Sequence, residues 1–350
     1  MTGFIGVHIG AGCHSEKLQT RYERICRLAC KKGIEAIRSG KSAVDAVAIA
    51  TVVLEDSQYT NAGLGSSLTW DGGVECDASL MDGDKLGFGA VGSVSRIKNP
   101  ILAAHRLCLD QYNQLSLNRV PPCFLVSTGA EKWALEKGLE IVEPHSLITE
   151  KSVKVFKKYK KRAELSSGRN EGESKVGVTS KLLDTVGAIV VDSEGRVAAS
   201  CSSGGIVLKH PGRVGQAGTY GCGCWAQNYG TGRSVATSVT GCGEDLIKTC
   251  LAREAANSLI HSAHATVAIN NTIRSFLDSP FLGKFSERLC GIIAIESEST
   301  GRGEFTWGHT TPSMAIGFMS VGQRIPKSHI SRLPLGANPG STVIIEGTPV

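Results

Sequence analysis

Two apolar tracts separated by a short turn constrain the fold of this chain more than any other feature. The tracts cover residues 185–191 and 197–205, and Asp-Ser-Glu-Gly-Arg lies between them. Apolar runs of this length on either side of turn-forming residues predict a buried β-hairpin. If the hairpin is symmetric about Glu194, Thr185 faces Ser203 at its open end, with Cβ atoms about 4.5–5.5 Å apart. A single β-bulge would instead shift the pairing by one residue.

The residue that begins the first tract, Thr185, follows Asp184. A threonine hydroxyl is a weak nucleophile until a base takes its proton, and an α-amino group on the same residue, with a reference pKa of about 7.7–8.0, is such a base. Cleavage of the Asp184–Thr185 bond would create that amino group. In this interpretation the hydroxyl first attacks the Asp184 carbonyl, and water hydrolyses the resulting ester. The alternative is that Thr185 is only a β-branched residue at the start of a strand.

Four motifs favour the first interpretation. They are Asp-Thr-Val-Gly-Ala at 184–188, Ser-Gly-Gly at 203–205, Lys-His-Pro-Gly-Arg-Val-Gly-Gln at 209–216 and Gly-Cys-Gly-Glu at 241–244. Together they resemble the type 2 asparaginase family of N-terminal-nucleophile hydrolases, and within it the threonine aspartase (taspase) branch. The resemblance covers nearly the whole chain.

The resemblance implies an α/β fold, a four-layer αββα sandwich formed by residues 1–350 as one domain. It also implies that the chain cuts itself between Asp184 and Thr185. The products would be an α chain of residues 1–184 and a β chain of residues 185–350, which associate as an αβ heterodimer and then as α2β2.

The same resemblance assigns the catalytic residues. Thr185 is the nucleophile, and Ser203 and Asn61 orient it, with the Asn61 amide holding the Thr185 hydroxyl or amine. Thr240 and Gly241 form the oxyanion hole, since a hydroxyl followed by backbone N–H groups at a strand end suits a developing oxyanion.

Substrate binding is assigned to Gly10, Arg213, Gln216 and Gly243. Arginine suits a substrate carboxylate because its planar donors bind both oxygens at once. The small-molecule asparaginases carry Asp where this chain has Gln216, and that Asp holds the free α-amino group of asparagine. Gln216 removes this charge, as expected for a substrate residue inside a polypeptide, and taspases also carry Gln there.

Other polar segments are assigned structural roles. Asp77 and Asp82 are expected to brace the loop and strand near Asn61, and the resemblance implies a structural monovalent cation near the Asn61 loop; no other cofactor is expected. The twelve cysteines are interpreted as reduced, mostly buried thiols. A zinc site at Cys222 and Cys224 is disfavoured because no C-x-x-C pair accompanies them.

The segment 145–184 is predicted to be a flexible basic linker that ends at the processing site. Its Lys/Arg cluster at 154–162 indicates either a solvated helix face or a nuclear-import signal, and the resemblance favours the second, with the protein in nucleus and cytoplasm. The net charge of +6 on 350 residues is too small for a dedicated nucleic-acid binder. No secretory leader or long apolar span is recognised, so a membrane association is not expected.

The remaining pattern predicts the scaffold. Helices are expected over 15–38, 42–55, 99–107, 128–137, 244–259 and 262–276. Strands are expected over 236–240, 291–295, 305–308 and 314–319, with a final edge strand over 342–347 and a connector at 121–126.

The sequence therefore predicts a threonine endopeptidase that cuts polypeptides after Asp. The resemblance implies nuclear transcription regulators as substrates, including trithorax-type histone methyltransferases. The alternatives are an L-asparaginase or isoaspartyl dipeptidase and, from another class, a non-catalytic nuclear binding module that uses the basic segment.

Overall fold

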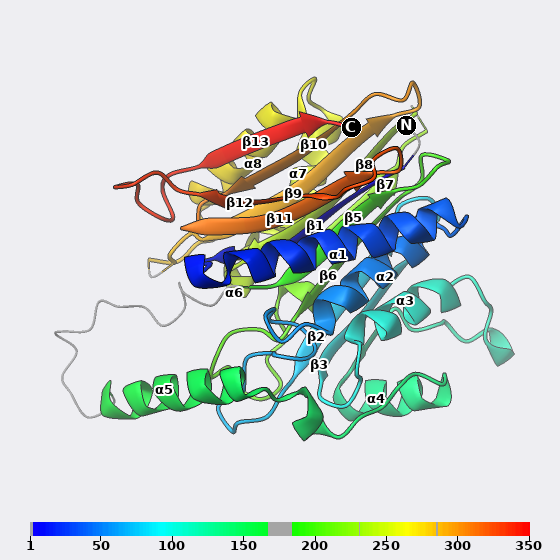
Figure 1. Ribbon diagram of the computed structural model, residues 1–350. Helices are drawn as coiled ribbons and strands as arrows, with labels where there is room; N and C mark the ends of the chain where they lie inside the picture. Colours follow the sequence, from blue (N-terminus) through cyan, green and yellow to red (C-terminus); the bar gives the residue numbers. More distant parts are fainter. Residues whose placement is uncertain (1–2, 167–183, 231, 285) are drawn as a thin grey trace.

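Two β-sheets lie face to face at the centre of the protein (Figure 1). The structure is a computed structural model that describes residues 3–166, 184–230, 232–284 and 286–350. The first sheet has eight strands, in the spatial order β12 (Lys327–Arg332), β11 (Ser313–Ser320), β1 (Phe4–Gly12), β5 (Val186–Val191), β6 (Val197–Ser203), β2 (Cys76–Asp82), β3 (Phe88–Val94) and β4 (Phe124–Val126). The second has five, in the order β13 (Ile344–Pro349), β10 (Gly303–His309), β9 (Cys290–Glu298), β8 (Arg233–Gly241) and β7 (Cys224–Asn228).

Helices cover the outer face of each sheet. The helices are α1 (Gln19–Arg38), α2 (Ala43–Glu55), α3 (Pro100–Asp110), α4 (Ser127–Glu136), α5 (Glu150–Ser166), α6 (Gly243–Thr249), α7 (Leu251–Ile260) and α8 (Ala265–Leu277). The first three pack on the eight-stranded sheet, and α7 and α8 pack on the five-stranded sheet. One apolar core fills the space between α1–α4 and the first sheet, and another fills the space between the sheets and under α7 and α8. The predicted αββα sandwich is confirmed.

The β5–β6 hairpin lies in the middle of the first sheet, between β1 and β2. Its register pairs Val186 with Ser202 and Val191 with Val197, which is the symmetric pairing that the sequence predicts. Every residue of both strands is buried. The uninterrupted apolar run of β5 follows from this position, because α2 covers one face of the strand and the second sheet covers the other.

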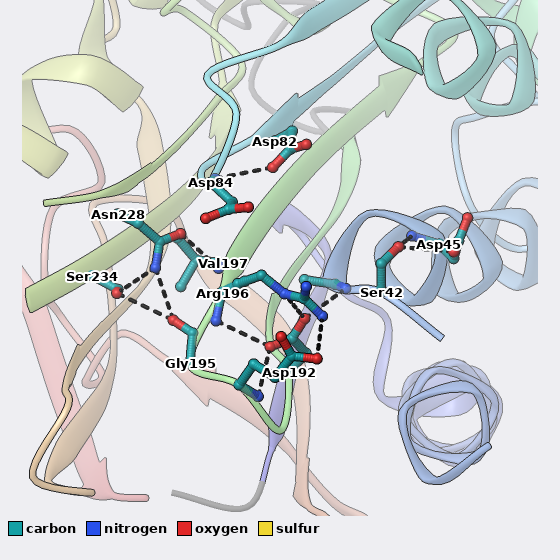
Figure 2. Close-up of polar contacts among 12 residues, drawn as sticks. Ser42, Asp45, Asp82, Asp84, Asp192, Gly195, Arg196, Val197, Asn228 and Ser234 are labelled. Carbon is teal, nitrogen blue, oxygen red and sulfur yellow. Dashed lines mark hydrogen bonds and ion pairs between the residues drawn. The ribbon is translucent and has the colours of Figure 1, made fainter. Parts of the chain in front are cut away.

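The turn that closes this hairpin is held by Asp192 (Figure 2). Its Oδ1 accepts hydrogen bonds from the backbone N–H groups of Glu194 at 2.9 Å and Arg196 at 3.0 Å, and its Oδ2 accepts one from Arg196 Nε at 2.8 Å. The same Oδ2 accepts a longer bond from the Ala43 N–H, in the first turn of α2, at 3.3 Å. Gly195 takes a φ of +79°, which a residue with a side chain rarely adopts. The turn thus sets the register locally.

Three sequence predictions are corrected by the structure. The expected helix 244–259 is two helices, broken at Cys250, whose φ is +46°. The expected connector at 121–126 contains the short edge strand β4, which pairs in parallel with β3. The expected flexible linker is helical over its first part, because α5 occupies Glu150–Ser166; residues 167–183 of the linker lie outside the described part of the chain.

Packing explains why α5 forms despite its charge. Tyr159 is buried on the helix, and Phe156 lies against the apolar core. Lys160 donates a hydrogen bond to the Trp70 carbonyl at 2.9 Å, and its ammonium lies 5.0 Å from the centre of the Trp70 ring. The apolar spacing on one helix face was therefore a signal that the lysine-rich composition concealed. No helix in the described residues is long and apolar enough to cross a membrane.

Candidate active site

Thr185 lies directly before β5, at the open end of the hairpin. Only 4% of its surface is exposed. Its hydroxyl donates a hydrogen bond to Ser203 Oγ at 3.0 Å and accepts one from Gln216 Nε2 at 3.1 Å. Ser203 Oγ also accepts the Gly205 N–H at 3.0 Å. The predicted pairing of Thr185 with Ser203 is confirmed, and the hydroxyl is held between one acceptor and one donor.

A small cavity opens beside this hydroxyl. It brings together segments that are far apart in the sequence, and its walls are formed by Asn61, Asp184, Thr185, Ser203, Gly205, Ile206, Arg213, Gln216, Gly241 and Gly243. Seven of the residues that the sequence assigns to the catalytic and substrate-binding groups therefore share one cavity wall. Their chemical roles stay predictions.

Asn61 lines the cavity and bonds to the segment that follows Ser203. Its Nδ2 donates to the Gly205 carbonyl at 2.7 Å, its Oδ1 accepts from the Ser67 N–H at 2.8 Å, and its carbonyl accepts from the Gly204 N–H at 2.7 Å. Asn61 therefore fixes this segment in the uncut chain, and its predicted hold on the Thr185 hydroxyl or amine stays a prediction.

The predicted oxyanion pair lies at the end of β8. Gly241 lines the cavity and has a φ of +143°, and a Cβ added there would lie 2.3 Å from the Leu289 carbonyl oxygen. Thr240 is fully buried, and its Oγ1 accepts the Ala11 N–H at 3.3 Å. Gly10 lies at an irregularity of β1, next to that contact, and does not form the cavity wall.

Arg213 has a partner that the sequence did not predict. Its Nε and Nη2 both donate to the carboxylate of Glu244, each at 2.8 Å. Burial acts to raise the pKa of Glu244, but the hydrogen bonds and charge of Arg213 outweigh it and leave that pKa below its usual value. The only sequence signal for this pair was the position of Glu244 directly after the Gly-Cys-Gly motif.

Asp184, the residue before the nucleophile, also lines this cavity. Its Oδ1 is buried and has no hydrogen-bond partner among the described residues. Burial raises the pKa of Asp184, and the positive charges of His14 and Lys151 act in the opposite direction. In the uncut chain the side chain of Asp184 is thus next to basic groups other than Arg213.

His8 and Gly187 lie on neighbouring strands close to Thr185. They face each other across β1 and β5, and His8 Nε2 lies 3.0 Å from Ser238 Oγ on the second sheet. A Cβ added to Gly187 would lie 2.0 Å from that oxygen, so only glycine leaves room for the contact. Burial lowers the pKa of His8 to about 3, and the imidazole is neutral.

Both aspartates accept backbone hydrogen bonds, but from segments other than the predicted Asn61 loop. Asp77 accepts the N–H groups of Gly215 and Ser93, both at 2.9 Å, and thereby holds the loop that carries Arg213 and Gln216. Asp82 accepts a hydrogen bond from the Asp84 N–H at 2.9 Å (Figure 2).

A buried glutamate lies beneath the open end of the hairpin. Glu55 is fully buried and accepts hydrogen bonds from Ser202 Oγ at 2.6 Å and the Ile101 N–H at 3.0 Å. Burial raises its pKa to about 8. The nearly continuous apolar run of α2, which Glu55 ends, gave no sign of this role.

Cysteines and ions complete the description. All twelve cysteines are free thiols, and eight of them are buried, Cys222 and Cys224 among them. Within the described residues, no three His, Cys, Asp or Glu side chains are grouped so as to hold a metal ion. The monovalent cation near the Asn61 loop stays a prediction. The backbone carbonyls of Glu55 and Gly63 in this region accept hydrogen bonds from Leu64 and Ser66 of the loop.

Comparison with known proteins places the chain in a family. Residues 1–328 match the family described as asparaginase. The chain is 40% identical over 244 residues to the isoaspartyl peptidase/L-asparaginase of Macaca fascicularis, which covers 70% of this chain and 72% of that protein. It is 37% identical over 276 residues to the Bos taurus protein of the same name, covering 76% and 82%, respectively. It is 35% identical over 263 residues to the isoaspartyl peptidase of Escherichia coli K12, covering 72% and 75%.

The family match spans nearly the whole chain, and the relatives align over both sides of Thr185. The two-sheet sandwich flanked by helices is consistent with this family. The chain belongs to the asparaginase family, within the superfamily of N-terminal-nucleophile hydrolases.

Proposed function

We propose that this protein is an endopeptidase that cuts polypeptides after aspartate, with Thr185 as its nucleophile. The main support is the position of Thr185 Oγ1, between the Ser203 hydroxyl at 3.0 Å and the Gln216 amide at 3.1 Å. A hydroxyl held by a donor and an acceptor has a fixed direction of attack, which lowers the entropic part of the barrier.

The first step in this proposal is self-cleavage. Thr185 Oγ attacks the carbonyl carbon of Asp184, the C–N bond breaks, and the nitrogen takes up the hydroxyl proton and becomes an α-amine. Water then hydrolyses the ester between Asp184 and Thr185, which releases the Asp184 carboxylate and the free hydroxyl. The chain thereby gains the base that its nucleophile needs.

In the cleaved protein the α-amine of Thr185 takes the proton of its own hydroxyl as Oγ attacks the substrate carbonyl. Gly241 and Thr240 stand at the strand end beside the cavity, where backbone N–H and hydroxyl groups would stabilise the oxyanion. The proton then passes to the leaving amine, and water hydrolyses the acyl ester. Arg213 binds the side-chain carboxylate of the substrate aspartate.

Residue 216 decides between a polypeptide and a free amino acid. The amide of Gln216 donates to Thr185 and carries no charge. A free amino acid brings an α-ammonium group that needs a negative partner, whereas an aspartate inside a polypeptide brings a neutral amide at the same position. This observation favours an endopeptidase.

A second candidate function comes from the comparisons. The similar proteins are named isoaspartyl peptidase/L-asparaginase, and the match extends across more than two thirds of each chain. Both activities would use Thr185 as the nucleophile and Arg213 as the carboxylate-binding residue. They differ from the first proposal in the substrate group that faces Gln216.

The wider setting of the proposal rests on the resemblance alone. It includes nuclear transcription regulators as substrates, with trithorax-type histone methyltransferases among them, a nuclear and cytoplasmic location, and an α2β2 assembly.

Intact-mass measurement with N-terminal sequencing tests the nucleophile. We expect purified wild-type protein to contain a fragment that begins at Thr185, and the Thr185→Val variant to remain a single chain. A wild-type chain that stays uncut after prolonged incubation would contradict the mechanism.

A substrate comparison tests the specificity. We expect the cleaved protein to cut an aspartate-containing peptide after Asp and to release little ammonia from free asparagine. The Gln216→Asp variant should shift the ratio of the two activities at least about tenfold toward asparagine, because it restores a partner for the α-ammonium group. Hydrolysis of asparagine or an isoaspartyl dipeptide by the wild type, with the peptide left intact, would establish the second candidate instead.

A further inference from the structure

Glu244 occupies one edge of the arginine that the proposed function uses to bind carboxylates. Its carboxylate receives Arg213 Nε and Nη2 in a parallel, two-point contact, each at 2.8 Å. The Arg213 side chain is 14% exposed and the Glu244 side chain 50% exposed. Two-point contacts between arginine and a carboxylate have a defined geometry, which an isolated surface ion pair lacks.

The contact leaves the other edge of the guanidinium for a ligand. A guanidinium has five N–H donors, one on Nε and two on each Nη. Glu244 uses one donor on Nε and one on Nη2, so both donors of Nη1 and the second donor of Nη2 remain without a partner among the described residues. These three donors are on the end of the side chain, and they form a second fork that fits another carboxylate.

Three glycines make room for this edge. A Cβ on Gly205 would lie 3.0 Å from Arg213 Nη1, and one on Gly215 would lie 2.9 Å from the same atom. A Cβ on Gly243 would lie 2.5 Å from Arg213 Nη2. Gly205 and Gly243 are also in the cavity wall beside Thr185, so the guanidinium end is directed to the place where a substrate binds.

We infer that Glu244 is a positioning residue that holds Arg213 by its Nε edge and thereby presents the Nη edge to the carboxylate of the substrate. This inference rests on the proposed role of Arg213, which is common to both candidate functions. Without Glu244, Arg213 stands on a loop with several rotatable bonds, and each substrate must order it anew.

Steady-state kinetics on the self-cleaved protein test the inference. We expect Glu244→Ala to raise KM for an aspartate-containing peptide at least tenfold while kcat changes less than threefold, because the reacting groups are untouched. Glu244→Gln keeps one acceptor of the same shape and should recover part of the KM effect. Glu254→Ala, on the exposed face of α7, is the matched control and should leave both constants unchanged.

Two further measurements separate the possible failures. The first is the equilibrium affinity for N-acetyl-L-aspartate, measured by calorimetry, which should weaken at least tenfold in Glu244→Ala. The second is the thermal midpoint: if Glu244 has only a structural role, Glu244→Ala lowers the midpoint and leaves the affinity unchanged. A KM that is unchanged or lower in both variants, or unchanged binding, would overturn the inference; a lower KM would mean that Glu244 competes with the substrate.

A failure of the proposed endopeptidase activity can be told apart from a failure of the inference about Glu244. If the wild-type protein leaves the peptide intact, asparagine and an isoaspartyl dipeptide replace it as substrates for the same variants, since both present a carboxylate. If the wild type turns over none of the three, the calorimetric comparison still decides the role of Glu244.

Discussion

The two ends of the β5–β6 hairpin differ in where their hydrogen-bond partners come from. At the turn, the Asp192 carboxylate accepts four hydrogen bonds, three of them from residues two to four positions further along the chain (Figure 2). At the open end, Thr185 is held by Ser203 and by Gln216, which is 31 residues away.

This difference separates stability from chemistry within one element. The turn is closed by local contacts that fix the register of the hairpin whatever happens at the site. The open end depends on loops that converge only in the folded protein, and its hydroxyl faces a cavity instead of more backbone. Substitutions at the turn should therefore change the free energy of unfolding, and substitutions at the open end should change activity.

The largest expected effect is at the nucleophile. Thr185→Val keeps the shape of the side chain and removes the hydroxyl, so we expect self-cleavage and peptide cleavage to fall at least about 1,000-fold. Thr185→Ser is the matched control, because it keeps a hydroxyl and should retain measurable self-cleavage. Intact mass over time measures both, and self-cleavage by the valine variant at the wild-type rate would refute the assignment.

The second prediction concerns the turn. Asp192 is 1% exposed, and its removal takes the acceptor from the N–H groups of Glu194 and Arg196 and from Arg196 Nε. We expect Asp192→Ala to lower the free energy of unfolding by about 3 kcal/mol. Urea unfolding in the uncut Thr185→Val background measures the loss.

The control for Asp192→Ala is the activity of the protein that stays folded. The Asp192→Ala variant, after self-cleavage, should have a kcat/KM within about threefold of the wild-type value when both are expressed per amount of folded protein. A variant that is fully stable but inactive would show that the two ends are coupled and would break the comparison.

The two ends also differ in how far the sequence predicts them. The register of the hairpin followed from the apolar tracts and the turn residues, because both signals are local. The motifs that resemble a known family located Ser203, Arg213 and Gln216 but not the contact made by Asn61. Glu244 was not predicted as the partner of Arg213, because its pairing depends on the loop and α6 meeting in space.

The helix α5 teaches the same lesson from the scaffold. Its lysine content predicted a solvated linker, yet Tyr159 is buried and Lys160 donates a hydrogen bond to the carbonyl of the distant Trp70. Propensity and composition describe a segment by itself, whereas the free energy that orders it here comes from tertiary contacts.

The third prediction uses the pH dependence of Glu55. Burial raises its pKa from 4.5 to about 8, so the folded state keeps a proton that the unfolded state releases above pH 4.5. Its contribution to stability is fully present below pH 4.5 and is lost as the pH rises to about 8. Over this range the wild-type site should lose about 3–5 kcal/mol of stability through this group.

Glu55→Gln isolates the effect because it cannot ionise. In the Thr185→Val background, we expect the free energy of unfolding to fall less steeply between pH 5 and pH 8 in the glutamine variant, as measured by urea unfolding at each pH. Parallel pH profiles for the two proteins would mean that Glu55 is ionised in the folded state.

The smallest expected effect is at the rim of the turn. Ser234 Oγ donates to the Gly195 carbonyl at 3.2 Å and accepts from Asn228 Nδ2 at 2.7 Å (Figure 2). Asn228 Nδ2 also donates directly to that carbonyl at 2.8 Å, so both groups keep a partner when the hydroxyl is removed. We expect Ser234→Ala to cost only about 1 kcal/mol and to leave kcat/KM unchanged. Ser234 on β8 and Asn228 on β7 join the turn to the second sheet. If Ser234→Ala lowered the free energy of unfolding as much as Asp192→Ala, the turn would depend on the second sheet and would not be closed by its own residues.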